Sequence, residues 1–169
     1  MLFASLRRSF FQKDDMRSKN LGVMIKATSG ILQNRLGLQD PNCAHSFCRL
    51  LGKMNTAHQL SELSTNSDFS TWIDQVYNFT MDNLKNWQST HNSQHYLLSF
   101  WSQLVAPVII MRENAPPNLE NCVRQITTAY VDSRVLLAEQ SANEGVREKY
   151  LLGLWPFLFV FNEKIRYRV

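Results

Sequence analysis

Residues 92–111 read NSQHYLLSFWSQLVAPVIIM, and this stretch decides the predicted fold. Asn92 and Ser93 carry side-chain oxygens that accept hydrogen bonds from the first turn of a helix. Apolar residues then recur at the spacing of one helical face, at Tyr96, Leu97, Phe100, Trp101, Leu104, Val105 and Val108. A face this wide and aromatic must be packed on both sides to be kept from water. The stretch therefore predicts a layered stack of helices.

Start and stop signals place two helices before this stretch. Asp14 and Asp15 precede a helix over residues 16–34, which Gly37 stops. The dipeptide Asp40-Pro41 puts an N-cap and a proline at the first positions of a helix that runs to residue 55. The predicted buried faces are Val23, Met24, Ala27, Ile31 and Leu32 in the first helix, and Ala44, Phe47, Cys48, Leu51 and Met54 in the second.

Similar signals frame the helices that follow. A polar link after residue 55 packs Leu60 and Leu63 beneath it, and Ser67 or Asp68 caps a helix over residues 69–87. Pro107 kinks or ends the helix that begins at Asn92. Asn118 caps the last helix. Its predicted face is Leu119, Val123, Ile126, Tyr130, Val131 and Arg134.

Helices therefore begin about every 25–27 residues, and short links make successive helices antiparallel. A pair takes about 50 residues, slightly more than one HEAT or armadillo repeat. This periodicity favours an all-α, HEAT-like α-solenoid in which each pair depends on the next, with a helical bundle as the alternative. The predicted division is a helical repeat segment over residues 1–135 and a divergent tail over residues 136–169, where helical spacing is lost.

Composition indicates a globular protein with a mild, dispersed positive charge. The formal net charge is +4, and the basic residues form no stripe of the kind that binds nucleic acid. No apolar run reaches the about 20 residues of a membrane span. The first 13 residues lack acids and contain Arg7, Arg8 and Lys13, as a mitochondrial transit peptide would, but an ordinary helix end is the preferred interpretation.

The candidate metal-binding and catalytic residues do not have the sequence spacing that a metal site or a catalytic motif requires. Cys43, His45 and Cys48 contain metal-ligand types, but positions 43 and 45 lie about 200° apart around a helix and point away from each other. The pair His91 and His95 lacks the glutamate of an HExxH zinc motif. The cysteines are interpreted as small packing residues in a reducing compartment.

Residues 78–80, NFT, match a glycosylation sequon, but Phe79 belongs to an apolar helical face, so the match is interpreted as chance. Neither a phosphate-binding glycine loop nor a GxSxG elbow occurs in the chain. The sequence therefore predicts no catalytic residue, no metal site, no cofactor and no enzymatic activity.

A set of collinear segments resembles the exportin-7 family within the importin-β superfamily of nuclear transport receptors. The segments are residues 5–11 (SLRRSFF), 40–42 (DPN), 47–51 (FCRLL), 59–63 (QLSEL), 78–80 (NFT), 92–101 (NSQHYLLSFW), 128–130 (TAY) and 133–134 (SR). They follow in the order and with nearly the gaps of that family, and the resemblance covers about residues 2–134. Beyond residue 134 the resemblance stops.

The resemblance implies part of a HEAT-repeat receptor that binds Ran-GTP and cargo proteins, contacts nucleoporins and carries cargo through the nuclear pore between nucleus and cytoplasm. None of the matching segments is a known binding motif, so the resemblance assigns no Ran contact to any residue. The alternative is a helical-repeat scaffold that binds partner proteins without dependence on Ran.

Overall fold

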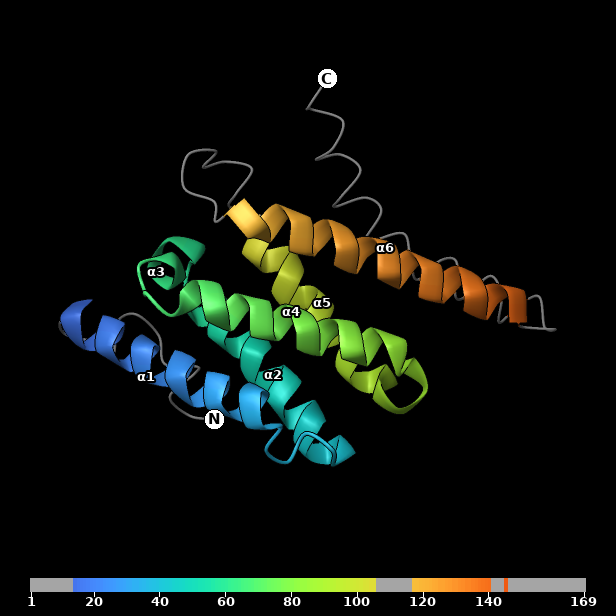
Figure 1. Cartoon of the computed structure of the whole chain (residues 1–169), viewed down its shortest axis with the longest axis horizontal. Coiled ribbons are helices and arrows are strands. Elements are labelled where there is room, and N and C mark those ends of the chain that lie inside the picture. Colours follow the sequence, from blue (N-terminus) through green and yellow to red (C-terminus); the bar gives the residue numbers. More distant parts are fainter. Residues whose placement is uncertain (1–13, 106–116, 141–144, 146–169) are drawn as a thin grey trace, which may run out of the picture. The chain divides into compact units, whose positions relative to one another are not determined.

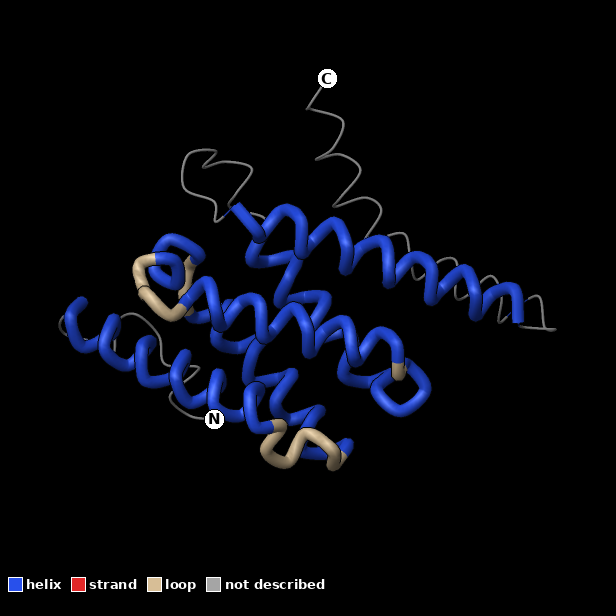
Figure 2. The backbone as a smooth tube through the Cα atoms, viewed as in Figure 1, coloured by secondary structure: helices blue, strands red, loops and turns tan. Residues whose placement is uncertain are grey.

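The structure, a computed structural model, describes residues 14–105, 117–140 and 145, with side chains left out at residues 14, 15, 87–92 and 117. Within these residues the chain is helical and forms no strand: α1 (Asp14–Asn34), α2 (Pro41–Ala57), α3 (Leu60–Ser64), α4 (Phe69–Lys85), α5 (Trp87–Val105) and α6 (Pro117–Gln140) (Figures 1 and 2). The all-α prediction is confirmed. The predicted kink at Pro107 and the apolar run at residues 151–161 lie outside the described residues.

The chain divides into two compact units, Met1–Cys122 and Val123–Val169. The first unit holds α1 to α5 and the first turns of α6. The predicted boundary between residues 135 and 136 stays a prediction.

The first unit is built from two antiparallel helix pairs, α1 with α2 and α4 with α5. Equivalent helices of the two pairs stack: α4 packs against α1, and α5 packs against α2 in the most extensive interface between described helices. Figure 1 shows α1 and α4 side by side and running in the same direction. Pairwise stacking of this kind is the geometry of successive repeats in a HEAT-like segment, as the sequence predicts.

Two buried tryptophans join neighbouring helices through threonine hydroxyls. Trp72 of α4 donates its indole N–H to Thr28 Oγ1 of α1 over 2.9 Å, and Trp101 of α5 donates to Thr80 Oγ1 of α4 over 2.9 Å. Each threonine in turn donates to the carbonyl four residues earlier in its own helix. All four side chains are at most 3% exposed, so both tryptophans bury a large ring with its polar atom satisfied.

The interface of α2 with α5 contains aromatic rings and one buried side-chain amide. Asn55 Nδ2 of α2 donates to the Phe100 carbonyl over 2.7 Å. The Phe100 ring lies edge-on to Trp72, with centroids 6.0 Å apart, and so links α5 to α4 as well. The predicted buried faces of α2 and α5 are confirmed at Phe47, Cys48, Leu51, Met54, Leu97, Phe100, Trp101 and Leu104.

The predicted buried face of α1 is confirmed at Leu32 but wrong at Val23 and Ala27. Val23 is 66% exposed and Ala27 is exposed, whereas the stripe that faces the core is Arg17, Leu21, Ile25, Thr28 and Leu32. The stripe keeps helical spacing but includes two polar residues, which apolar periodicity alone does not count. Their hydrogen bonds to distant segments make this face the buried one.

We expect truncations of Val23 and Ile25 to distinguish the predicted buried face of α1 from the observed one. Val23→Ala should change the free energy of unfolding by less than about 0.5 kcal/mol, since the side chain is exposed. Ile25→Val, which removes a single methylene from a side chain with 0% exposure, should cost about 0.5–1.5 kcal/mol. Urea unfolding followed by circular dichroism measures both, and the reverse ranking would contradict the observed face.

The predicted cap of α2 is confirmed. Asp40 has extended backbone angles, its carboxylate accepts from the Cys43 N–H over 2.8 Å, and Pro41 opens the helix. α1 ends at Asn34, three residues before Gly37. Arg35 and Gly37 both have positive φ, 50° and 70°, and the Leu36 N–H donates to the Ile31 carbonyl, so the left-handed turn begins earlier than predicted.

α4 begins at Phe69 as predicted, but its predicted cap is not made, and the predicted starts of α5 and α6 are wrong. α5 begins at Trp87, which places Asn92 inside the helix, because a single-residue turn at Asn86 lets the chain resume helix at once. Asp68 precedes α4 but makes no capping bond. Instead Asn66 Oδ1 accepts from the Asp68 N–H. α6 begins at Pro117, one residue before the predicted cap at Asn118.

The link after α2 contains a helix that the sequence analysis missed. α3 is only five residues long, too short for periodicity to reveal. Its Leu60 and Leu63 are buried, as predicted for the link.

Of the second unit, the structure describes α6 from Val123 onward and Gly145. The predicted positions Val123, Ile126 and Tyr130 are buried, and the Arg134 guanidinium lies 5.0 Å from the centre of the Tyr130 ring. Val135 and Leu136 are exposed, at 38% and 51%.

Candidate functional site

The cysteine and histidine side chains near residue 45 lie in different environments in the structure. Cys43 is exposed and Cys48 is fully buried. His45 Nδ1 lies 3.3 Å from Ser93 Oγ, and its ring packs edge-on against Tyr96. In the described part of the chain, no three histidine, cysteine or acidic residues lie close enough together to hold a metal ion.

The three thiols have raised pKa values. Burial raises the pKa of Cys48 to about 12, so this residue packs as a neutral thiol. The pKa of Cys43 is raised by its contact with the Asp40 carboxylate, and that of Cys122 by burial and then by the nearby Asp74. Since thiolates are the reactive form, these shifts make all three poor nucleophiles at neutral pH.

The third residue of the glycosylation sequon is packed in the core. Thr80, its third residue, is fully buried and both donates to the Val76 carbonyl and accepts from Trp101. The chance interpretation therefore agrees with the position of Thr80 in the core. His95 is exposed beside Tyr96.

In the described part of the chain, a cluster of titratable side chains joins α1, α2 and α3, and sequence analysis did not find it. Glu62 Oε2 of α3 accepts from Arg17 Nη2 of α1 over 2.9 Å and from Arg17 Nε over 3.2 Å. His58 Nδ1, just after α2, lies 3.2 Å from the same oxygen. Arg17 also donates to the Ala57 carbonyl at the end of α2. Because these residues are 40 to 45 positions apart from Arg17, no local spacing could reveal them.

We call Arg17, His58 and Glu62 the Arg–His–Glu clamp. It borders a cavity of about 280 Å³ that Ser18, Ser61 and Thr65 also line. Arg17 and His58 are only 6% and 4% exposed. A single carboxylate oxygen of Glu62 contacts both Arg17 and His58, and the Arg17 guanidinium donates a hydrogen bond to the last carbonyl of α2. The clamp therefore fixes three helices together.

The clamp shifts two pKa values. Burial and the neighbouring Arg17 cation lower the pKa of His58 from its ordinary 6.5, against the opposing effect of Glu62. Burial acts to raise the pKa of Glu62, but hydrogen bonds and charge from Arg17, with help from His58, lower it below its ordinary 4.5.

We expect acid to weaken this unit in two stages. The unfolded chain binds a proton on His58 at a higher pH than the folded chain does, so stability falls as pH drops below about 6.5. The contribution of ionised Glu62 is present above 4.5 and is lost as pH falls through its lowered folded pKa. Urea midpoints measured from about pH 7.5 to 5 should fall, and His58→Gln should flatten the upper part of that curve. A parent curve that rises on acidification would contradict the assignment.

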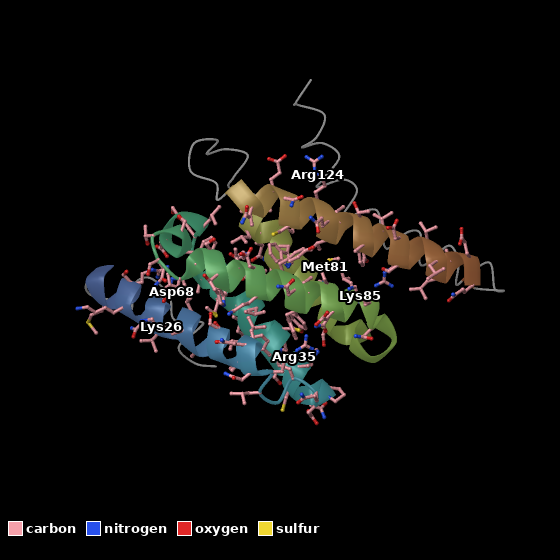
Figure 3. All side chains as sticks on the ribbon, viewed as in Figure 1. Lys26, Arg35, Asp68, Met81, Lys85 and Arg124 are labelled. Atoms are coloured by element: carbon pink, nitrogen blue, oxygen red, sulfur yellow. The ribbon has the colours of Figure 1, made fainter. Side chains whose placement is uncertain are left out.

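A second cavity, of about 330 Å³, opens between the C-terminal halves of α1 and α4 and the start of α2. We call it the α1–α4 cleft. Arg35, which lies just past α1 and is labelled in Figure 3, pairs across the cleft with Asp82 of α4. Leu32, Ala44 and Phe79 supply its apolar lining. Neither Arg35 nor Asp82 was singled out by sequence analysis, because the ion pair joins positions 47 residues apart.

The stacked helix pairs define the class of the chain as a HEAT-like helical-repeat protein. Comparison with known proteins then gives particular relatives. The chain is homologous to exportin-7 and Ran-binding proteins 16 and 17. It is 40% identical over 133 residues to Ran-binding protein 17 of Homo sapiens, which is 79% of this chain and 12% of that protein.

Two further relatives agree. Exportin-7-A of Xenopus laevis is 39% identical over 145 residues, 86% of this chain and 13% of its own length. Exportin-7 of Dictyostelium discoideum is 33% identical over 132 residues, 78% of this chain and 13% of that protein. The chain thus spans about an eighth of the relatives that it matches. The resemblance found in the sequence is confirmed, and these exportins are transport receptors rather than enzymes.

No protein-family profile matches the chain, and no solved structure matches it. Among the described helices, none is both long enough and apolar enough to cross a membrane.

Proposed function

We propose that the chain is part of a nuclear export receptor that binds Ran-GTP and cargo proteins and mediates their export through the nuclear pore. The observation that carries the proposal is the 40% identity to Ran-binding protein 17 across 133 residues, together with 39% identity to Exportin-7-A. Both names describe the function proposed here, Ran binding in one and export in the other. The receptor shuttles between nucleus and cytoplasm and contacts nucleoporins on the way.

The proposed mechanism is binding without chemistry. Ran-GTP and cargo each favour the same curvature of a helical stack, so each raises the affinity of the other, and hydrolysis of GTP releases both. The two-layer stack suits this mechanism because its curvature is set by how α4 sits on α1 and how α5 sits on α2. We propose residues 1–135 as the repeat segment that takes part, and residues 136–169 as a divergent tail.

A binding assay tests the proposal. The chain is passed over immobilised Ran locked in its GTP form, with GDP-bound Ran as the matched control. Retention on the GTP form alone is the expected result. Equal retention on both forms, or on neither, would overturn the proposal for this chain and leave the Ran-independent helical scaffold as the function.

A further inference from the structure

The face of α1 that points away from the core carries a second apolar stripe. Met16 and Val23 are 55% and 66% exposed, and Ala27 is exposed as well. Together with Asn20 they recur at steps of four, three and four residues, which places them on one narrow strip of the helix surface. At 100° per residue this strip lies about 130° around α1 from the residues that face the core. We call Met16, Asn20, Val23 and Ala27 the outer stripe.

The outer stripe accounts for the apolar periodicity that predicts the wrong buried face of α1. The periodicity includes Val23, Met24, Ala27 and Ile31, and the structure leaves all four exposed or half-buried. α1 therefore has apolar residues on two faces, whereas a helix on the surface of a globular protein has one. Among the described helix residues of the first unit, Met16 and Val23 are the exposed large apolar side chains. A regular apolar stripe that stays exposed marks a contact surface.

The chain itself contains a segment that matches the outer stripe. Residues 2–11 read LFASLRRSFF and lie outside the described residues. Phe3, Leu6 and Phe10 recur at steps of three and four, the spacing of the apolar seam between two packed helices. Two residues, 12 and 13, then lead into α1, and links this short join antiparallel helices. Because the tether is short, the segment has an effective concentration of about millimolar at the stripe, above that of a separate partner.

An antiparallel alignment puts the two spacings in register. Phe3 and Phe10 are seven positions apart, and so are Met16 and Val23. The opposed pairs are then Phe10 with Met16, Leu6 with Asn20, and Phe3 with Val23. Ten residues of helix extend about 15 Å, and Met16 and Val23 are separated by about 10 Å along α1. The segment is therefore long enough to cover both exposed side chains.

We propose that residues 2–11 form a helix that packs antiparallel on the outer stripe of α1. In a helical stack an apolar outer face is stabilised by the next helix that covers it. A helix of ten residues is marginal in water by itself, so its order depends on this contact. For the same reason the contact adds little to global stability, and Val23→Ala keeps the small effect on unfolding that its exposure predicts. The inference goes beyond the proposed function, because it requires neither Ran nor cargo.

Disulfide trapping in the full chain tests the proposed register. The trap is Leu6→Cys/Asn20→Cys, which leaves both phenylalanine contacts in place, in a Cys43→Ser background that removes the exposed native thiol. The control is Arg8→Cys/Asn20→Cys. Its loop is two residues shorter and closes at least as readily in a flexible chain, but position 8 lies on the far side of the proposed helix.

The two variants are equilibrated in a glutathione redox buffer and analysed by mass spectrometry. The trap should form its intramolecular disulfide with an effective concentration at least about tenfold above that of the control, because Cα atoms more than about 7 Å apart are not bridged. An effective concentration equal to or below that of the control would show that residues 2–11 do not dock, and would overturn the proposal. Disulfide-linked dimers would overturn it too, since they assign the outer stripe to a second copy of the chain.

Two neighbouring phenylalanines give an independent readout in the same trap. Phe10→Ser removes a ring from the proposed seam and should lower the effective concentration at least about tenfold, since burial of such a side chain is worth that much or more. Phe11→Ser is the matched control. Position 11 lies about 100° around the helix from position 10, so this change should alter the value by less than about twofold. Equal effects of the two substitutions, or no effect of Phe10→Ser, would contradict the proposed packing.

Discussion

Trp101→Ala should lower the free energy of unfolding by about 3–5 kcal/mol, the range for removal of a buried large aromatic ring. Trp101 is 1% exposed, packs edge-on against Phe100 and donates its indole N–H to Thr80. The substitution therefore leaves a cavity and removes the hydrogen bond that joins α5 to α4. Because domains are typically stable by only about 5–15 kcal/mol, the variant is expected to lose a large share of the stability of the chain.

Urea unfolding followed by circular dichroism measures the effect, with two controls. Trp101→Phe keeps most of the ring volume and loses the indole N–H, so it should cost clearly less than the alanine variant. Gln103→Ala, on the exposed side of the same helix, should change stability by less than about 0.5 kcal/mol. A Trp101→Ala midpoint equal to that of the parent, with partner binding lost, would mean that the tryptophan serves a binding surface.

Glu62→Ala should cost about 2–3 kcal/mol, the second largest effect. The change leaves the guanidinium of Arg17, whose side chain is 8% exposed, without its carboxylate. Breaking a fully buried ion pair by removing one partner costs about 3–5 kcal/mol, and the 27% exposure of the Glu62 side chain reduces that figure.

A double-mutant cycle separates the ion pair from simple loss of packing. Arg17→Met keeps the apolar stem but removes the bonds to Glu62 and to the Ala57 carbonyl, at an expected cost of about 1–2 kcal/mol. In Arg17→Met/Glu62→Ala no buried charge is left unpaired, so the double variant should cost less than the sum of the single changes by about 1 kcal/mol or more. Strict additivity would show that the two side chains do not interact energetically.

The sequence alone predicted much of the fold. Long apolar periodicities gave the helices and the buried faces of α2 and α5, since the side chains that face the core there are apolar. The dipeptide Asp40-Pro41 gave the start of α2, because the cap is made within four residues of chain. The collinear segments gave the relatives that comparison then found.

Neither polar site could be predicted. Arg17 and Glu62 are 45 residues apart, and Arg35 and Asp82 are 47 apart, so their pairing depends on how α1 meets α3 and α4. Gln75 and Asn78 look like ordinary surface residues of a helix in the sequence. Only the position of the α1–α2 loop makes them line a cleft.

The sequence by itself determined that this protein is a stack of helices and which helices are long, because helical periodicity and caps are local. It also determined which family of receptors the chain resembles. Only the tertiary structure decided which side of α1 is buried. Val23 is exposed, and Arg17 and Thr28 are inside. A polar side chain is stable in the core when a distant group satisfies it, as Glu62 satisfies Arg17 and as Trp72 and Thr28 satisfy each other. Those partners exist only once α1, α3 and α4 have come together.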